Sequence, residues 1–149
     1  MITKEATGET VLNLKRKATL ALASAAMLVG SVAVSGPANA ASSPIAACGG
    51  GSYHVIDQHS LSGGAIIYLL YNGTYNCVVT WKTGSSVGSP SNMGAFLQRK
   101  SDEKSVSDRG SYSYYAGPVK LAASGTCIIW GGFAFGSYAS WYSAWSHCG

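Results

Sequence analysis

The chain has 149 residues, of which 47% are hydrophobic and only 11% are charged, and its formal net charge is +4. Four of the ten basic and two of the six acidic residues precede residue 41, so residues 41–149 carry only +2. This near-neutral balance, with no basic run longer than Arg99-Lys100, excludes the electrostatic footprint of a nucleic-acid-binding protein.

Residues 1–40 have the pattern of a secretory signal peptide. The basic cluster Lys15-Arg16-Lys17 precedes an uncharged run of small and apolar residues, and residues 37–40 supply the small-x-small motif of a cleavage site. An uncleaved membrane anchor is the less favoured alternative, because the run is short and rich in Ala, Gly and Ser. We therefore expect cleavage after Ala40 and a secreted protein, extracellular or at the cell surface, that is free of the membrane.

Lipid attachment at Cys48 is a second alternative, because Ile45-Ala46-Ala47-Cys48 looks like a lipoprotein cleavage box. That box lies well beyond the apolar run, and lipidation would leave an odd number of cysteines. An even cysteine count in a small exported chain instead predicts two disulfides among Cys48, Cys77, Cys127 and Cys148. Of the three connectivities we favour Cys48–Cys77 and Cys127–Cys148, each of which closes a local loop. The spacings fit no zinc pattern, so we expect no metal and no other cofactor.

The first predicted elements are a flexible N-terminal segment and a β-hairpin. Residues 41–52 are small and flexible, and residues 53–149 are expected to be a single β domain beginning with a strand at 53–59. Residues 65–71 and 74–81 are two β-rich strands joined by Asn72-Gly73, the dipeptide typical of a two-residue type I′ turn.

This turn predicts a register in which Leu70 lies opposite Tyr75 and Tyr68 lies opposite Cys77. One face of the hairpin then carries Ile66, Tyr68, Leu70, Tyr75, Cys77, Val79 and Trp81. The other face carries Ala65, Ile67, Leu69, Tyr71, Thr74, Asn76, Val78 and Thr80. We expect the first, more aromatic face to point into the core. The second face is still half apolar, which indicates either a covering element or a contact surface.

Extended structure and turns continue to the C-terminus. The expected elements are a loop at 84–92, a strand at 93–100, a polar turn at 101–104, an extended stretch at 106–115 that Gly117-Pro118 breaks, a strand or short helix at 119–123, a strand at 126–130 and one or two short strands in the tail. The sequence therefore predicts an all-β protein, a small antiparallel β-barrel or sandwich with two disulfides, preceded by a signal peptide.

Few residues suit catalysis. His54, Asp57 and His59 form one cluster, in which Asp57 and His59 share a strand face, but a polar strand face is the preferred interpretation. Asp102 and Glu103 fall in a turn between lysines and are interpreted as a solvated loop. No nucleophile elbow, zinc-protease motif or phosphate-binding loop occurs, so we expect no enzyme.

Aromatic residues are a stronger lead, because all nine Tyr, four Trp and three Phe follow residue 40. Trp141 and Trp145 would share a face if the tail were a strand, and Tyr142 and Tyr138 lie close by in sequence. Such rings can stack on the flat faces of sugars. Core filling is the preferred interpretation of these rings, and a carbohydrate or cell-wall-binding surface is the alternative.

Several blocks of residues resemble the spore-associated protein A family, small exported proteins of filamentous actinomycetes. The most specific are Tyr71-Asn72-Gly73-Thr74-Tyr75-Asn76-Cys77 and Tyr114-Tyr115-Ala116-Gly117-Pro118-Val119, and the ending His147-Cys148-Gly149 agrees. The resemblance implies secretion and association with the spore or aerial-hypha surface, and it implies no activity. The chain departs from the family at its Trp-rich end, at Trp141 and Trp145.

We therefore expect an exported, non-catalytic protein of the cell or spore surface, with a cell-wall or spore-surface polymer or a secreted protein as its partner. Two alternatives remain. One is a carbohydrate-binding module that uses the tail aromatics, and the other is a small inhibitor of secreted hydrolases that presents the loop at 84–92.

Overall fold

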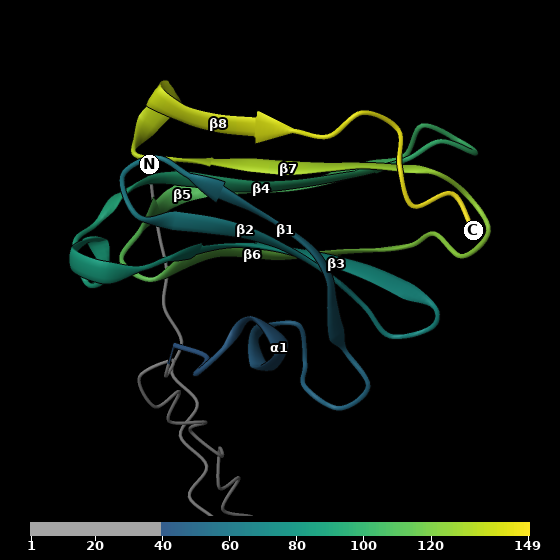
Figure 1. The fold of residues 1–149 in the computed structure, drawn as a ribbon, viewed down its shortest axis with the longest axis horizontal. Coiled ribbons are helices and arrows are strands. Elements are labelled where there is room, and N and C mark those ends of the chain that lie inside the picture. Colours follow the sequence, from purple (N-terminus) through teal and green to yellow (C-terminus); the bar gives the residue numbers. More distant parts are fainter. Residues whose placement is uncertain (1–39) are drawn as a thin grey trace, which may run out of the picture. The chain divides into compact units, whose positions relative to one another are not determined.

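Eight strands form two antiparallel four-stranded sheets in the computed structural model, which describes residues 40–149 (Figure 1). The first sheet has the order β1-β2-β3-β6 and the second sheet the order β5-β4-β7-β8. The strands are β1 (His54–Leu61), β2 (Ala65–Tyr71), β3 (Tyr75–Lys82), β4 (Ser91–Arg99), β5 (Ser105–Tyr112), β6 (Tyr115–Ala122), β7 (Ile128–Ala134) and β8 (Ala139–Tyr142). The all-β prediction is confirmed. A barrel or a sandwich was predicted, and the fold is a sandwich. The predicted signal peptide lies outside the described residues except for Ala40.

Aliphatic side chains from both sheets meet in the core between them. The first sheet contributes Ile67, Leu69 and Val78, and the second contributes Met93 and Leu97, all fully buried. The predicted choice of core face in the hairpin is therefore wrong, because the face with Ile67 and Leu69 points to the second sheet. Side chains from the inner faces of two packed sheets interdigitate, and the second sheet covers this face.

The aromatic face of the first sheet is covered by the N-terminal segment. Leu70, Cys77 and Val79 form a second buried cluster there with Cys48, and the rings of Tyr68, Trp81 and Tyr115 pack against it. The hairpin is thus covered on both faces, as its half-apolar second face indicated.

The hairpin register differs from the prediction by two residues. Leu70 pairs with Cys77, and Tyr71 pairs with Asn76. The Asn72 side-chain oxygen accepts hydrogen bonds from the backbone N–H of Thr74 (3.0 Å) and of Tyr75 (2.7 Å), which widens the turn beyond the type I′ geometry. Because side chains alternate with period two, this shift leaves every residue on its predicted face.

The segment at 41–52, expected to be a flexible tether, contains the one-turn helix α1 (Pro44–Ala47). The Ser43 hydroxyl accepts from the N–H of Ala46 at 3.1 Å, and Pro44 occupies the first turn, where its missing N–H costs nothing. Figure 1 shows α1 beneath the first sheet. The Cys48–Cys77 disulfide joins this segment to β3, and Cys127–Cys148 holds the C-terminus, so the favoured pairing is confirmed.

The predicted break at Gly117-Pro118 is wrong, because β6 runs through both residues from Tyr115 to Ala122. β6 is an edge strand, and its pairing with β3 shifts between the Val78 and Thr80 positions. A proline without an N–H is tolerated at such an irregular edge position.

The loop and the tail each add a short 3-10 helix, η1 (Gly84–Ser86) and η2 (Gly136–Tyr138). β8 follows η2 and pairs with β7 as a short edge strand. Beyond β8 the chain continues along β7, where Ser146 exchanges two backbone hydrogen bonds with Ile128.

Candidate functional site

Trp141, the first tail aromatic of interest, packs inward at the junction of the two sheets. Its ring stacks on His59 of β1 with the centroids 4.1 Å apart, and it meets the core ring of Trp130 edge-on at 4.8 Å. The structure therefore gives Trp141 a packing role between β8 and β1.

The other three tail aromatics are exposed but lie apart. β8 ends at Tyr142, so the alternation that would bring Trp141 and Trp145 to one face does not continue to Trp145. Trp145 lies beside Lys100, whose ammonium is 5.8 Å from the ring centroid, and Tyr138 in η2 is 95% exposed. Of these three, Tyr142 is the one whose ring packs against another ring, on a larger surface.

That surface is the outer face of the second sheet. Gly131 of β7 pairs with Phe96 of β4 on one side and with Tyr142 of β8 on the other. Gly94 of β4 pairs with Arg109 of β5 on one side and with Phe133 of β7 on the other. Directly paired residues project from the same face of a sheet, so these two rows of side chains lie next to each other. We call the set Phe96, Arg109, Phe133 and Tyr142 the aromatic–arginine face.

Two glycines let the rings lie close to the backbone. A Cβ on Gly94 would come within 2.3 Å of the Phe133 ring, and a Cβ on Gly131 would come within 2.6 Å of the Tyr142 ring. The Phe96 and Tyr142 rings meet edge to face with the centroids 5.7 Å apart. Tyr142 is 47% exposed, so one ring of this cluster remains open to solvent.

Two hollows of about 520 and 500 Å³ flank this cluster and share Arg109, Phe133 and Tyr142 in their walls. Both lie in the size range of small-molecule sites. Their remaining walls are largely polar or small and comprise Asn92, Gly94, Ala95, Phe96, Gln98, Ser107, Gly110, Ile129, Ser137, Ser140 and Ser143. The face thus combines an apolar ring surface with hydroxyl and amide groups that can donate and accept hydrogen bonds.

The charge of this face comes from Arg109. Its guanidinium lies over the Phe133 ring, 4.9 Å from the centroid, and no carboxylate in residues 40–149 forms an ion pair with it. The adjacent Asp108 points to the opposite side of β5. There Asp108 accepts hydrogen bonds from the Tyr112 hydroxyl (2.6 Å) and the Gly117 N–H (2.7 Å). The bond from Tyr112 raises the pKa of its hydroxyl, and burial adds to the shift.

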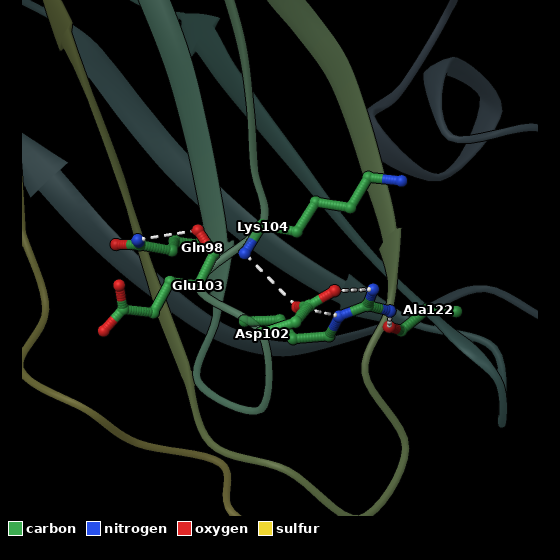
Figure 2. Close-up of polar contacts among 6 residues, drawn as sticks. Gln98, Asp102, Glu103, Lys104 and Ala122 are labelled. Atoms are coloured by element: carbon green, nitrogen blue, oxygen red, sulfur yellow. Dashed lines mark hydrogen bonds and ion pairs between the residues drawn. The ribbon is translucent and has the colours of Figure 1, made fainter.

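Asp102 and Glu103, which the sequence analysis placed in a solvated loop, lie in an ordered turn between β4 and β5 (Figure 2). Arg99 donates to both oxygens of Asp102, at 2.7 and 2.6 Å, and a third N–H reaches the carbonyl of Ala122. The hydrogen bonds from Arg99 lower the pKa of Asp102 to about 2. Gln98 donates to the Glu103 carbonyl at 3.0 Å. Arg99 thus links the turn, through Asp102, to the end of β6.

The His and Asp cluster does not come together as one group. Asp57 bonds to Nε2 of His147 at 3.1 Å, whereas His59 stacks on Trp141 and Nδ1 of His54 lies 3.3 Å from the Ser52 carbonyl. Within residues 40–149, no three His, Cys, Asp or Glu side chains are grouped to hold a metal. Asp57 and His147 instead connect β1 to the C-terminal tail.

The loop at 84–92, considered above as an inhibitory loop, is held at its base. The Ser86 hydroxyl bonds to the carbonyls of Gly64 (2.6 Å) and Thr83 (2.7 Å), and the Gly88 N–H bonds to the Ser113 carbonyl (2.8 Å). Val87 is 47% exposed between these anchors.

These features define a small disulfide-bonded β-sandwich with a polar, ring-bearing outer sheet face. The chain is similar to spore-associated protein A of Streptomyces coelicolor, with 35% identity over 104 residues, or 68% of this chain. The resemblance stated from the sequence is therefore confirmed. The matched region spans 64% of that relative. No family model matches the chain, and no solved structure matches it. The part described here, residues 40–149, contains no helix long and apolar enough to cross a membrane.

Proposed function

We propose that this protein is exported and acts without catalysis at the surface of the spore or cell, where its aromatic–arginine face holds a polysaccharide. The name of its relative, spore-associated protein A, supports the location. Two disulfides also support it, because disulfides persist in oxidising compartments outside the cytoplasm.

The observation that carries the proposal is the exposed Tyr142 ring between two hollows. A tyrosine ring is apolar on its faces and polar at its hydroxyl. It therefore suits a sugar, which has apolar faces and carries hydroxyl groups at its edges. The hydroxyls of Ser107 and Ser140 and the amide of Gln98 border the same face and supply matching hydrogen-bonding groups.

Retention on insoluble polysaccharides tests this function. We expect the secreted protein to be retained on at least one of chitin, cellulose and peptidoglycan, and Tyr142→Ala to reduce the retained amount severalfold. Tyr138→Ala is the matched control, because Tyr138 is 95% exposed and does not line the two hollows. Absence of retention on all three polymers, or equal retention of Tyr142→Ala and the unmodified protein, would refute the proposal.

Inhibition of secreted hydrolases is a second candidate, favoured by the exposed Val87 in its hydrogen-bonded loop. A loop held in one conformation loses little entropy on binding a protease cleft. The test is a panel of serine proteases and amylases assayed with the protein and with Val87→Asp. If no enzyme of the panel is inhibited, this candidate is wrong.

A further inference from the structure

We infer that the polysaccharide bound by the aromatic–arginine face carries carboxylate groups, and that Arg109 selects it. This inference rests on the proposed function and names the chemical class of the ligand. It concerns the charge of the face, whereas the proposal above concerns its rings.

Arg109 is placed as a recognition residue, since both hollows include it and no carboxylate in residues 40–149 pairs with it. The Phe133 ring beneath the guanidinium, 4.9 Å away, is itself only 7% exposed. A guanidinium that packs over an aromatic ring loses part of its freedom, and the N–H groups along its edge match the two oxygens of a carboxylate. Tyr142 shares both hollows with Arg109, so a sugar stacked on Tyr142 brings its substituents close to the guanidinium.

Three of the four acidic residues in residues 40–149 bond to partners away from this face. Asp108 is turned toward Tyr112 and Gly117, Asp102 is paired with Arg99, and Asp57 is paired with His147 on the first sheet. Glu103 lies in the β4–β5 turn, six residues along β5 from Arg109, which corresponds to roughly 20 Å of extended chain. The surface around the guanidinium is therefore positive.

A second cation extends this surface along β4. Lys100 follows the last residue of β4, and its N–H bonds to the Cys127 carbonyl, which continues the β4–β7 pairing by one step. Side chains alternate between the two faces of a strand, so Lys100 lies on the same outer face as Phe96 and Gln98. There its ammonium lies beside the exposed Trp145 ring. The face thus repeats the combination of an aromatic ring and a cation, which fits an extended anionic chain better than a single neutral sugar.

Polygalacturonate and its fully methyl-esterified form are suitable probes, because the sugar backbone is the same and only the free carboxylates differ. By calorimetry at low salt, we expect the unmodified protein to bind polygalacturonate at least about tenfold more tightly than the ester. Arg109→Gln should remove most of this difference, and added salt should reduce it. Arg109→Lys should keep part of the preference, because it retains the charge and loses the planar edge. Lys120→Gln is the matched control, because Lys120 lies over a ring (Tyr53, 5.4 Å) on the first sheet.

The outcomes separate this inference from the proposed function. Equal binding of both polymers, lost in Tyr142→Ala, would leave a glycan site and overturn the selection of carboxylates. A preference for carboxylates that Arg109→Gln leaves undiminished, or that Lys120→Gln reduces equally, would also overturn it. Tighter binding of poly(glycerol phosphate) than of polygalacturonate would assign the face to phosphodiesters instead. No binding of any polymer would refute the proposed function as well.

Discussion

The ring of Tyr142 lies directly over Gly131 on the neighbouring strand. A Cβ on Gly131 would come within 2.6 Å of Cδ1 of Tyr142 and within 2.3 Å of the Trp141 carbonyl oxygen. The glycine is therefore what allows β8 to approach β7 closely enough for its tyrosine to lie along the sheet.

Gly131→Ala is expected to displace Tyr142 and weaken the pairing of β8 with β7. Inserting a methyl group into a closely packed position typically costs about 1–3 kcal/mol, and urea unfolding measures that loss of stability. Retention on the polysaccharide that binds the unmodified protein should fall with it. Ser140→Ala, at an exposed position of β8, is the control for stability alone and should change it by less than about 0.5 kcal/mol. An unchanged unfolding curve for Gly131→Ala would contradict this account of the β7–β8 contact.

The ion pair of Asp102 and Arg99 predicts a loss of stability in acid. The pKa of Asp102 is lowered from 3.8 to about 2 by the hydrogen bonds from Arg99, so the folded protein holds the ionised form more strongly than the unfolded chain. This contribution is complete above the unfolded pKa of 3.8, and it is lost as the pH falls toward 2.

Asp102→Asn is therefore expected to show a smaller drop in melting temperature across this acid range than the unmodified protein. Glu103→Gln removes the adjacent carboxylate and is the control, because its side chain does not bond to Arg99 in the described turn. If Asp102→Asn loses as much stability as the unmodified protein between pH 3.8 and 2, the assigned role of the pair is wrong.

Local patterns in the sequence predicted the strands and the cysteine pairing but not the choice of core face. Residues 65–71 form β2 as predicted, and the two short-range disulfides formed as favoured. The aromatic content of the hairpin pointed to the wrong core face because both faces are covered. The second sheet covers one face and the N-terminal segment covers the other. Contacts between residues distant in sequence decide which face each of them covers.

The aromatic–arginine face could not be predicted for the same reason. Phe96, Arg109, Phe133 and Tyr142 come from four different strands, and they meet only through the β5-β4-β7-β8 order. Their sequence spacings carry no local motif. Tyr142 could be found because it lies among many aromatic residues near the C-terminus. The only sequence signal for Arg109 was its place in the extended stretch predicted at 106–115. Trp141, equally conspicuous, packs inward because the alternation of β8 places it opposite to Tyr142.

The Cys48–Cys77 disulfide is expected to stabilise the fold through the N-terminal cover. The bond links residues 29 apart in sequence, and closing a loop of that size stabilises a protein by about 3–4 kcal/mol in the chain-entropy description. The double variant Cys48→Ser/Cys77→Ser should lose about that much in urea unfolding, and it should also bind a hydrophobic dye as Leu70 and Val79 lose their cover.

Comparison with Cys127→Ser/Cys148→Ser separates the two effects. That bond closes a 21-residue separation at the C-terminus, so its removal should cost a similar loop entropy without uncovering the first sheet. Dye binding equal in both double variants would show that the N-terminal segment does not depend on Cys48 to cover its face.

Because Lys82 is buried, we expect the free energy of unfolding to increase as the pH is raised above neutral. Its side chain is 1% exposed, its ammonium donates to the Ser89 carbonyl, and it lies 5.8 Å from the Phe135 ring centroid. Burial lowers the pKa of Lys82 below its usual value of 10.5, so the unfolded chain binds this proton more strongly than the folded protein does. Stability should therefore increase with pH between the lowered pKa and 10.5.

Lys82→Met keeps the length of the side chain and removes its charge, so it should be at least as stable as the unmodified protein near neutral pH and should lose the alkaline rise. Urea unfolding in steps from about pH 7 to about pH 9 measures both, below the range in which tyrosines ordinarily ionise. Lys120→Met is the control, because it removes the same charge from an exposed position and should keep the rise. A pH-independent stability of the unmodified protein, or an alkaline rise that persists in Lys82→Met, would show that the buried ammonium carries no penalty for its charge.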